Sequence, residues 1–262
     1  MTLVHFMLVY GDLMYPYIKL FNFYIPSYGL CICMAVFLYA VLVFKKAYKI
    51  NIDSNDLIIL SAVSIGCGIL SGNLLYIVIT YNFETLYKQI VVGDFSFLQN
   101  SGIVFYGGLI GGLAGGIITA KMLRIKMESV EICVIPYIPL GHAIGRIGCL
   151  LAGCCYGLPY KGIFAVSTVC DLSHRTYFPI QLIEALYNLL IMGVLLFYVK
   201  RKRTKYSVIR LYLIMYSCLR FFWEFFRGDT IRGSFLIFST SQWISLIIFL
   251  LCFILGRKNS LK

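Results

Sequence analysis

The chain has 262 residues, of which 60% are hydrophobic and only 13% are charged. A soluble domain of this size is about a quarter charged, and here the apolar residues come in long blocks. The composition therefore excludes an ordinary soluble domain and predicts an all-α, polytopic integral membrane protein. The net charge of +12 does not indicate a nucleic-acid partner, because the basic residues lie in short clusters between apolar blocks.

The predicted elements begin with residues 1–27, which are rich in aromatic side chains and which we expect to lie along the membrane interface. The apolar blocks that follow predict about seven transmembrane helices. These helices fall near 28–44, 56–81, 102–120, 132–151, 179–199, 207–226 and 235–255. We expect the whole chain, 1–262, to form one membrane-embedded domain.

Two connections and one kink can be predicted within this series. Glu84, Lys88 and Asp94 indicate a sparsely charged loop between the second and third segments. Two prolines, at 136 and 139, predict a kink or a broken first half in the fourth segment. Residues 154–178 are polar and predict a short external loop.

The basic clusters predict the orientation of the chain. With about seven spans, the clusters at 45–49, 121–126, 200–205 and 257–262 all fall on one side of the membrane. By the positive-inside rule this side is the cytoplasm. We therefore expect the N-terminus outside, the C-terminus in the cytoplasm, and the ends of the fourth and sixth segments toward the outer leaflet.

The stretch GHAIGRIGCLLAGCCYG, residues 141–157, places Arg146 and His142 inside a run that otherwise predicts a buried helix. A charged residue at that depth costs about 2.5–3.5 kcal/mol by insertion scales, which makes Arg146 a candidate functional residue. His142 lies one helical turn earlier on the same face. It could act as a general base, or it could be a packing residue with its hydrogen bonds satisfied.

The sixth segment ends in RFFWEFFRGD, in which Arg220, Glu224 and Arg227 share one helical face. Glu224 can pair with either arginine, and Glu184 of the fifth segment is a further candidate partner. Positive groups still exceed negative ones, and arginine matches phosphate in a bidentate way, which favours an anionic lipid headgroup as ligand. The alternative is a structural ion-pair network with one arginine extending to water.

Glycines and cysteines complete the set of candidate residues. Tyr106 stands at the start of a segment whose paired glycines recur at helical spacing. Such faces of small residues are typical of closely packed helices. Cys149, Cys154 and Cys155 do not have the spacing of a structural zinc site, so we expect no metal and no cofactor. They are instead candidate reactive thiols near arginines, or partners in a disulfide that could include Cys170.

Several motifs in one order resemble the prolipoprotein diacylglyceryl transferase family over nearly the whole chain. They are Tyr28-Gly29, GIVFYGGLIGG at 102–112, PYIPLGHAIGRIG at 136–148, FPIQLIEALYN at 178–188, RFFWEFFRGD at 220–229 and STSQWISL at 239–246. The resemblance implies an enzyme of the bacterial cytoplasmic (inner) membrane with a lateral opening to lipid. Such enzymes move the diacylglyceryl group of phosphatidylglycerol to the lipobox cysteine of a prolipoprotein signal peptide, and glycerol 1-phosphate is released.

The resemblance also implies roles for single residues. Arg146 and Arg220 match arginines that would hold the phosphate and stabilise charge on the leaving group. Tyr106 stands where many members have the His of an HGG motif and, with His142, completes the candidate catalytic residues. The positions that would line the substrate cavity are Tyr28, Gly107, Gly108, Glu224 and Arg227.

Four positions depart from the family pattern. Cys149 and Ala152 stand where the family has Asn, Cys154 stands where it has Glu, and Asn73 stands where it has an arginine in the second segment. These departures change the prediction of the acceptor substrate more than that of the lipid donor. The alternative to a transferase is therefore a non-catalytic or altered-acceptor paralogue that binds anionic lipid or peptide in the membrane.

Overall fold

The computed structural model describes residues 15–20, 23–99, 104–168, 175–201, 207–228, 234–235 and 237–259. Most of the interfacial segment expected over 1–27, the basic residues 202–206 and Cys170 lie outside this part of the chain. By their internal contacts the residues divide into two compact units, Met1–Val43 with Val134–Lys262, and Phe44–Cys133. The site residues fall in both units, so each unit is described by itself.

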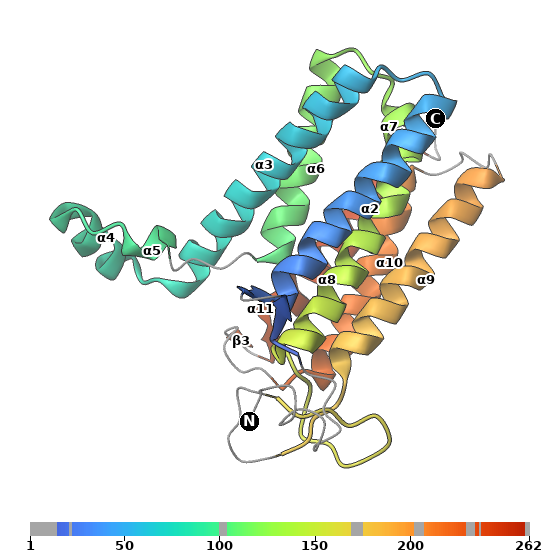
Figure 1. The fold of residues 1–262 in the computed structure, drawn as a ribbon. Helices are drawn as coiled ribbons and strands as arrows, with labels where there is room; N and C mark the ends of the chain where they lie inside the picture. Colours follow the sequence, from blue (N-terminus) through green and yellow to red (C-terminus); the bar gives the residue numbers. More distant parts are fainter. Residues whose placement is uncertain are drawn as a thin grey trace. The chain divides into compact units, whose positions relative to one another are not determined.

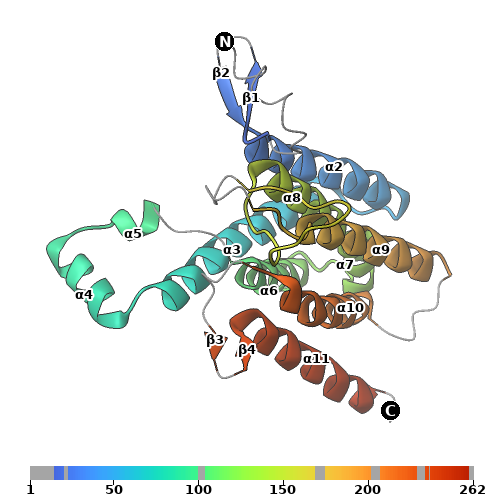
Figure 2. The same ribbon diagram turned by 90° about the horizontal axis from the view of Figure 1, so that it is seen from below.

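The first unit is built around α8, α9 and α10, with α9 packed against both of the others (Figure 1). Helix α10 also packs against α11, and Figure 2 shows these two helices side by side. The bounds of its elements in chain order are β1 Tyr17–Leu20, β2 Phe23–Pro26, α2 Ser27–Lys49, η1 Ile135–Tyr137, α8 Ile138–Ala152, α9 Ile180–Lys200, α10 Val208–Trp223, η2 Glu224–Phe226, β3 Ser234–Phe235, β4 Phe238–Ser239 and α11 Thr240–Asn259. The last turn of α2 belongs to the second unit.

Small side chains set the approach of α2 to α8. Cys31 and Ala35 of α2 are buried against Ile144 of α8. A Cβ at Gly148 would lie 2.9 Å from the Cβ of Cys31, so the helices can approach this closely only where α8 has glycine. This packing holds the N-terminus of α2 beside the second half of α8.

The second unit contains α3 Ser54–Thr80, α4 Phe83–Val92, α5 Ser96–Gln99, α6 Phe105–Met122 and α7 Met127–Cys133. Helices α3 and α6 pack along most of their length. Ser71 Oγ of α3 donates a hydrogen bond to the carbonyl oxygen of Gly107, at 2.7 Å. A Cβ at Gly115 would lie 2.8 Å from Cys67. The paired glycines of α6 therefore serve helix packing, which is the role predicted for those after 110.

Four helical segments of the described chain are long and apolar enough to cross a membrane. They are Ser27–Lys49, Ser54–Thr80, Met127–Ala152 and Ile180–Lys200, and Thr240–Ile254 is a shorter apolar helix. The third of these is interrupted by η1, which contains Pro136, and this confirms the predicted break. The expected all-α class holds for the spans, while two short antiparallel hairpins, β1–β2 and β3–β4, accompany them.

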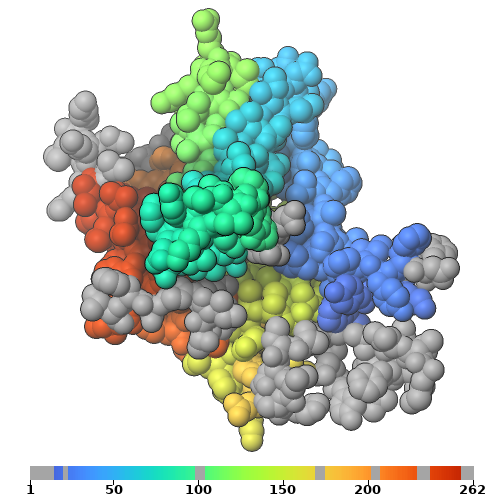
Figure 3. All heavy atoms as spheres, turned by 90° about the vertical axis from the view of Figure 1, so that its left-hand side faces the viewer, coloured from blue at the N-terminus to red at the C-terminus, as the bar shows by residue number. Residues whose placement is uncertain are grey.

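The connection after α3 differs from the loop that its charges predicted. Residues 83–92 form α4, which is stabilised by an i,i+4 ion pair between Glu84 and Lys88 and ends at Gly93 in the left-handed conformation (φ 77°). No residue of α4 is buried, and Figure 3 shows its side chains uncovered on the face turned to the viewer. The few charges in this segment therefore belong to a short helix.

Candidate functional site

The candidate site lies where α8 and α10 end and α9 begins, at one end of the three packed helices (Figure 1). Each helix contributes one charged side chain from its turns nearest this end. Arg146 comes from α8, Glu184 from α9 and Arg220 from α10. Because neighbouring helices run antiparallel, residues far apart in the sequence reach the same depth.

Glu184 is the common partner of three arginines. Its Oε2 lies 2.5 Å from Nε of Arg146, and its Oε1 accepts a hydrogen bond from Nη1 of Arg220. Nη1 of Arg227 also donates to Oε1, at 3.1 Å. The Glu184 side chain is completely buried, so its negative charge is stabilised by these guanidinium groups and not by water. From the sequence, Glu184 was only a further candidate, and the structure makes it the centre of the cluster.

Glu224 forms the second acidic position. Its Oε2 lies 2.7 Å from Nη2 of Arg220 and 3.7 Å from Nε of Arg227, which confirms the predicted pairing. The predicted single helical face is wrong for Arg227, because α10 ends at Trp223 and Arg227 has extended backbone after η2. Oε1 of Glu224 accepts a hydrogen bond from Ser239 Oγ, at 3.0 Å. Ser239 also accepts a hydrogen bond from the backbone N–H of Gln242, so the first turn of α11 is tied to the ion-pair cluster.

The cluster carries one surplus positive charge among the described residues. Three arginines face two carboxylates, and all five side chains are buried, with Arg146 7% and Arg220 3% exposed. Within the described chain, Arg146 forms its ion pair through Nε alone, so its two terminal amino groups can donate to a ligand. A buried charge is costly unless it is paired, so a ligand that contacts these guanidinium groups is expected to carry negative charge.

The loop after α8 holds Arg227 in place. Gly157 forms a β-bridge with Arg227 and donates its N–H to the carbonyl oxygen of Phe178, at 3.2 Å. A Cβ at Gly157 would lie 2.5 Å from that oxygen and 3.0 Å from the carbonyl oxygen of Phe226. Only glycine fits between these two segments, as expected of a glycine where two backbones approach closely.

His142 lies on the inner side of α8 and is held by two neighbours. Its ring packs against Tyr216 of α10 with centroids 5.4 Å apart, and the side chain of Asn188 lies beside it. Asn188 in turn donates to the carbonyl oxygen of Glu184, at 2.7 Å. Asn188 is a residue of this network that sequence reasoning missed. A buried amide within the FPIQLIEALYN run was the available signal.

Tyr28 connects the buried cluster with the surface of the first unit. It starts α2, is 45% exposed, and interacts electrostatically with Arg146 and Cys149. A Cβ at Gly148 would lie 3.2 Å from its ring, so the ring rests on the glycine of α8. Tyr28 therefore lies against α8 at Gly148, two residues along the chain from Arg146, and its role in lining a substrate cavity stays a prediction.

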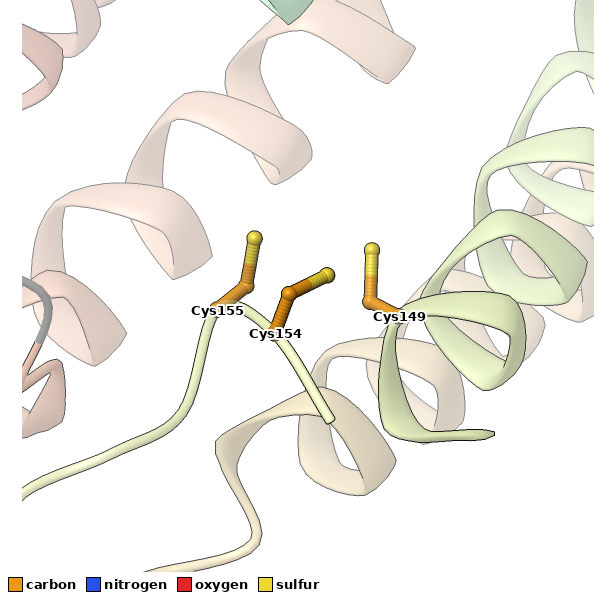
Figure 4. A group of neighbouring side chains, drawn as sticks. All are labelled: Cys149, Cys154 and Cys155. Atoms are coloured by element: carbon orange, nitrogen blue, oxygen red, sulfur yellow. The ribbon is translucent and has the colours of Figure 1, made fainter. Parts of the chain in front are cut away.

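Three of the cysteines meet beside this cluster. The Sγ atoms of Cys149, Cys154 and Cys155 all lie within 4.8 Å of one another, and Figure 4 shows the three thiols side by side, with that of Cys154 directed toward Cys149. Hydrogen bonds from the Cys149 and Cys154 thiols lower the pKa of Cys155, with the charges of Arg146 and Arg227 acting in the same direction and burial opposing them. None of the three forms a disulfide with another cysteine of the described residues, and Cys170 lies outside them.

The remaining expected site residues, Tyr106, Gly107 and Gly108, belong to the second unit, as does Asn73. Tyr106 is buried, 3% exposed, in the first turn of α6. A Cβ at Gly107 would lie 2.7 Å from the carbonyl oxygen of Ser71, so this glycine is required by the packing of α6 on α3. The contact of these residues with substrate stays a prediction.

A family model and several known proteins are similar to this chain over most of its length. The model of the family described as prolipoprotein diacylglyceryl transferase matches residues 16–256. A phosphatidylglycerol–prolipoprotein diacylglyceryl transferase 2 of Clostridium perfringens is 32% identical over 250 residues, covering 93% of this chain and 94% of the relative. Similarly named proteins of Clostridium tetani and Clostridioides difficile are 32% and 30% identical and cover 87% and 81% of this chain, and 90% and 82% of their own lengths.

Proposed function

Because the chain belongs to the prolipoprotein diacylglyceryl transferase family, we propose that it transfers the diacylglyceryl group of phosphatidylglycerol to the lipobox cysteine of a prolipoprotein. The observation that carries this proposal is the convergence of Arg146 and Arg220 on one buried carboxylate. Two guanidinium groups at one depth, in a cluster whose described residues are three arginines and two carboxylates, suit a single lipid phosphate.

The proposed reaction uses the positive charge of these arginines. The thiolate sulfur of the acceptor attacks the glycerol carbon that bears the phosphate, so a C–S bond forms while the C–O bond breaks. The electron pair stays on the phosphate oxygen, and the leaving glycerol phosphate gains one negative charge. Arg146 and Arg220 stabilise this developing charge from fixed positions, which is the largest contribution expected of such a site.

The other predicted site residues would take part in substrate binding or proton transfer. The exposed side chain of Tyr28 would contact the lipid headgroup as it enters beside Arg146. Glu224 and Arg227 would hold the guanidinium group of Arg220 in its orientation. Tyr106 would donate a hydrogen bond to a phosphate oxygen, and Gly107 and Gly108 would line the lipid. His142 would accept the proton of the acceptor thiol, directly or through a water.

The proposed topology has about seven spans in one membrane-embedded domain of the bacterial cytoplasmic membrane. In the first unit, Lys200 and Arg201 end α9 at the opposite end from Glu184, and the C-terminal basic residues end α11 opposite Ser239. If the basic ends face the cytoplasm, the site opens toward the outer leaflet and the C-terminus is cytoplasmic.

The test is a transfer assay with the full chain in lipid nanodiscs that contain phosphatidylglycerol. We expect a lipobox peptide to gain the diacylglyceryl group by mass spectrometry, and glycerol phosphate to be released. Arg146→Ala should reduce this rate by at least about 100-fold while the protein stays inserted. Arg201→Ala, which changes an exposed arginine outside the cluster, is the matched control and should retain the rate.

Two results would contradict the proposal. One is an Arg146→Ala variant that works as well as the control. The other is phosphatidylglycerol binding without any thioether product, under conditions in which a relative forms product. This second result would favour the non-catalytic paralogue, which the two cysteines and the alanine at the family's Asn and Glu positions suggest.

A further inference from the structure

The three clustered thiols have the geometry of a ligand set for a soft metal ion. Zn–S bonds are about 2.3 Å long, so sulfurs that share a zinc ion lie about 3.8–4.0 Å apart in tetrahedral or trigonal geometry. The Sγ atoms of Cys149, Cys154 and Cys155 lie within 4.8 Å of one another. Small rotations of these side chains would close the remaining gap, and Figure 4 shows the three side chains next to one another.

The backbone of the turn after α8 is what gathers them. Gly153 ends α8 in the left-handed conformation (φ 69°), and Cys155 also has a positive φ, 58°. A positive φ at a residue other than glycine costs free energy and persists only where its surroundings impose it. Gln181 of α9 donates to the carbonyl oxygen of Cys154, at 2.8 Å, and so holds the turn against the bundle. The adjacent cysteines are thereby directed back toward Cys149.

We propose that Cys149, Cys154 and Cys155 form a binding site for a thiophilic divalent cation such as Zn²⁺. Thiolate ligands select such ions over hard cations. Three thiolates and one divalent ion carry a net charge of −1, so a filled site would not place net positive charge beside Arg146 and Arg227. Linear spacing does not reveal the site, because Cys149 lies on a helix and the other two lie in the turn that follows it.

Three protein ligands leave the fourth position of a tetrahedral ion open, as in catalytic zinc sites. This part of the inference rests on the proposed function: the open position would take the acceptor thiol. A thiol that coordinates the metal is deprotonated, and its proton would pass to water and then to His142. The metal-held thiolate would then make the C–S bond while the phosphate oxygen leaves toward the arginines. The site therefore supplies activation of the acceptor where the family has Asn and Glu.

Metal binding can be tested without any substrate. The full chain, purified in detergent under reducing conditions and stripped of metal, would be titrated with Co²⁺, and then with Zn²⁺ in competition. We expect one equivalent of Co²⁺ to bind with an intense sulfur-to-metal charge-transfer absorption. Loss of a residue that only supports a metal ligand weakens metal binding about 10–100-fold. Loss of a ligand itself should weaken Co²⁺ binding by at least about 100-fold, which we expect for each of Cys149→Ser, Cys154→Ser and Cys155→Ser.

Cys252→Ser is the matched control, because Cys252 is a buried cysteine of α11 that does not belong to the cluster. Its Co²⁺ spectrum should equal that of the unchanged chain. The metal site is ruled out if the reduced protein binds no Co²⁺, or if the three cluster variants bind as tightly as the control. It is also ruled out if peptide mapping of protein isolated with thiols blocked finds a disulfide between two of these cysteines.

The role of the open position needs a second measurement. A lipobox peptide added to the Co²⁺-loaded protein should increase the charge-transfer absorption, and the same peptide with serine in place of cysteine should not. Equal spectra with the two peptides would remove the acceptor role and leave the metal site intact. A transfer assay that fails while Co²⁺ binds as expected would instead count against the proposed function.

Discussion

Glu184 and Arg146 lie on neighbouring antiparallel helices, and their side chains meet with Oε2 of the carboxylate 2.5 Å from Nε of the guanidinium. The carboxylate also accepts Arg220 and Arg227 through its other oxygen. One acidic residue therefore sets the positions of three arginines. The geometry of the proposed phosphate site therefore depends on a residue that is itself completely buried.

Replacement of Glu184 by Gln should damage both stability and activity. The amide keeps the shape of the side chain but leaves the buried guanidinium groups without their shared counter-charge, and breaking a buried ion pair costs about 3–5 kcal/mol. Thermal unfolding in detergent should show a lower Tm, and the transfer assay a large loss of rate. Glu84→Gln, which removes an exposed ion pair of α4, is the control and should leave the Tm nearly unchanged. Equal Tm values for the two variants would show that Glu184 does not organise the cluster.

Arg220→Lys tests whether activity requires the planar guanidinium group of Arg220 or only its positive charge. Arg220 uses Nη1 for Glu184 and Nη2 for Glu224, and one ammonium group cannot reproduce that planar, two-pronged contact. We expect kcat/KM for phosphatidylglycerol to fall at least about tenfold, which corresponds to roughly 1.4 kcal/mol of transition-state stabilisation. Arg201→Lys should keep the kinetics of the unchanged chain. A fully active Arg220→Lys enzyme would mean that charge alone is sufficient.

Gly148→Ala should separate α2 from α8. The added Cβ would lie 2.9 Å from the Cβ of Cys31 and 3.2 Å from the ring of Tyr28, and overpacking of this kind costs about 1–3 kcal/mol. Because Tyr28 would move relative to Arg146, KM for phosphatidylglycerol should rise. Gly141→Ala on the same helix has no atom within 4 Å of the new Cβ and should leave Tm and KM unchanged or slightly improve stability. A Gly148→Ala protein with the properties of the Gly141 variant would contradict this account.

Adjacent glycines of α6 should differ in their tolerance of alanine. At Gly107 the new Cβ would lie 2.7 Å from the carbonyl oxygen of Ser71, whereas at Gly108 the nearest atom, the carbonyl oxygen of Gly68, is 3.5 Å away. We expect Gly107→Ala to be destabilised by about 1–3 kcal/mol and Gly108→Ala to keep nearly its original Tm. Equal effects at both positions would indicate that α6 does not need this close approach to α3. If instead Gly108→Ala kept its Tm but lost transfer activity, the proposed contact of this glycine with lipid would be supported.

Much of the fold could be predicted because it depends on local properties of the sequence. Long apolar blocks predict helices that cross a membrane, and the helices observed at 27–49, 54–80 and 180–200 begin and end close to the expected limits. Pro136 predicts the break before α8 because proline lacks the N–H that a continuous helix needs. The exposed helix α4 was missed because its scattered charges were interpreted as a loop, although its ten residues do have the apolar periodicity of an amphipathic helix.

By itself, the sequence determined which arginines had to matter. A guanidinium inside an apolar segment is costly wherever its neighbours lie, so Arg146 and Arg220 could be identified without a structure. Only the tertiary structure decided that Glu184, 36 residues away from Arg220, is their shared partner, and that Cys149 meets the two cysteines of the following turn. These contacts depend on how antiparallel helices align in depth and how a turn reverses direction. The spacing of residues along one segment predicts neither of these two properties.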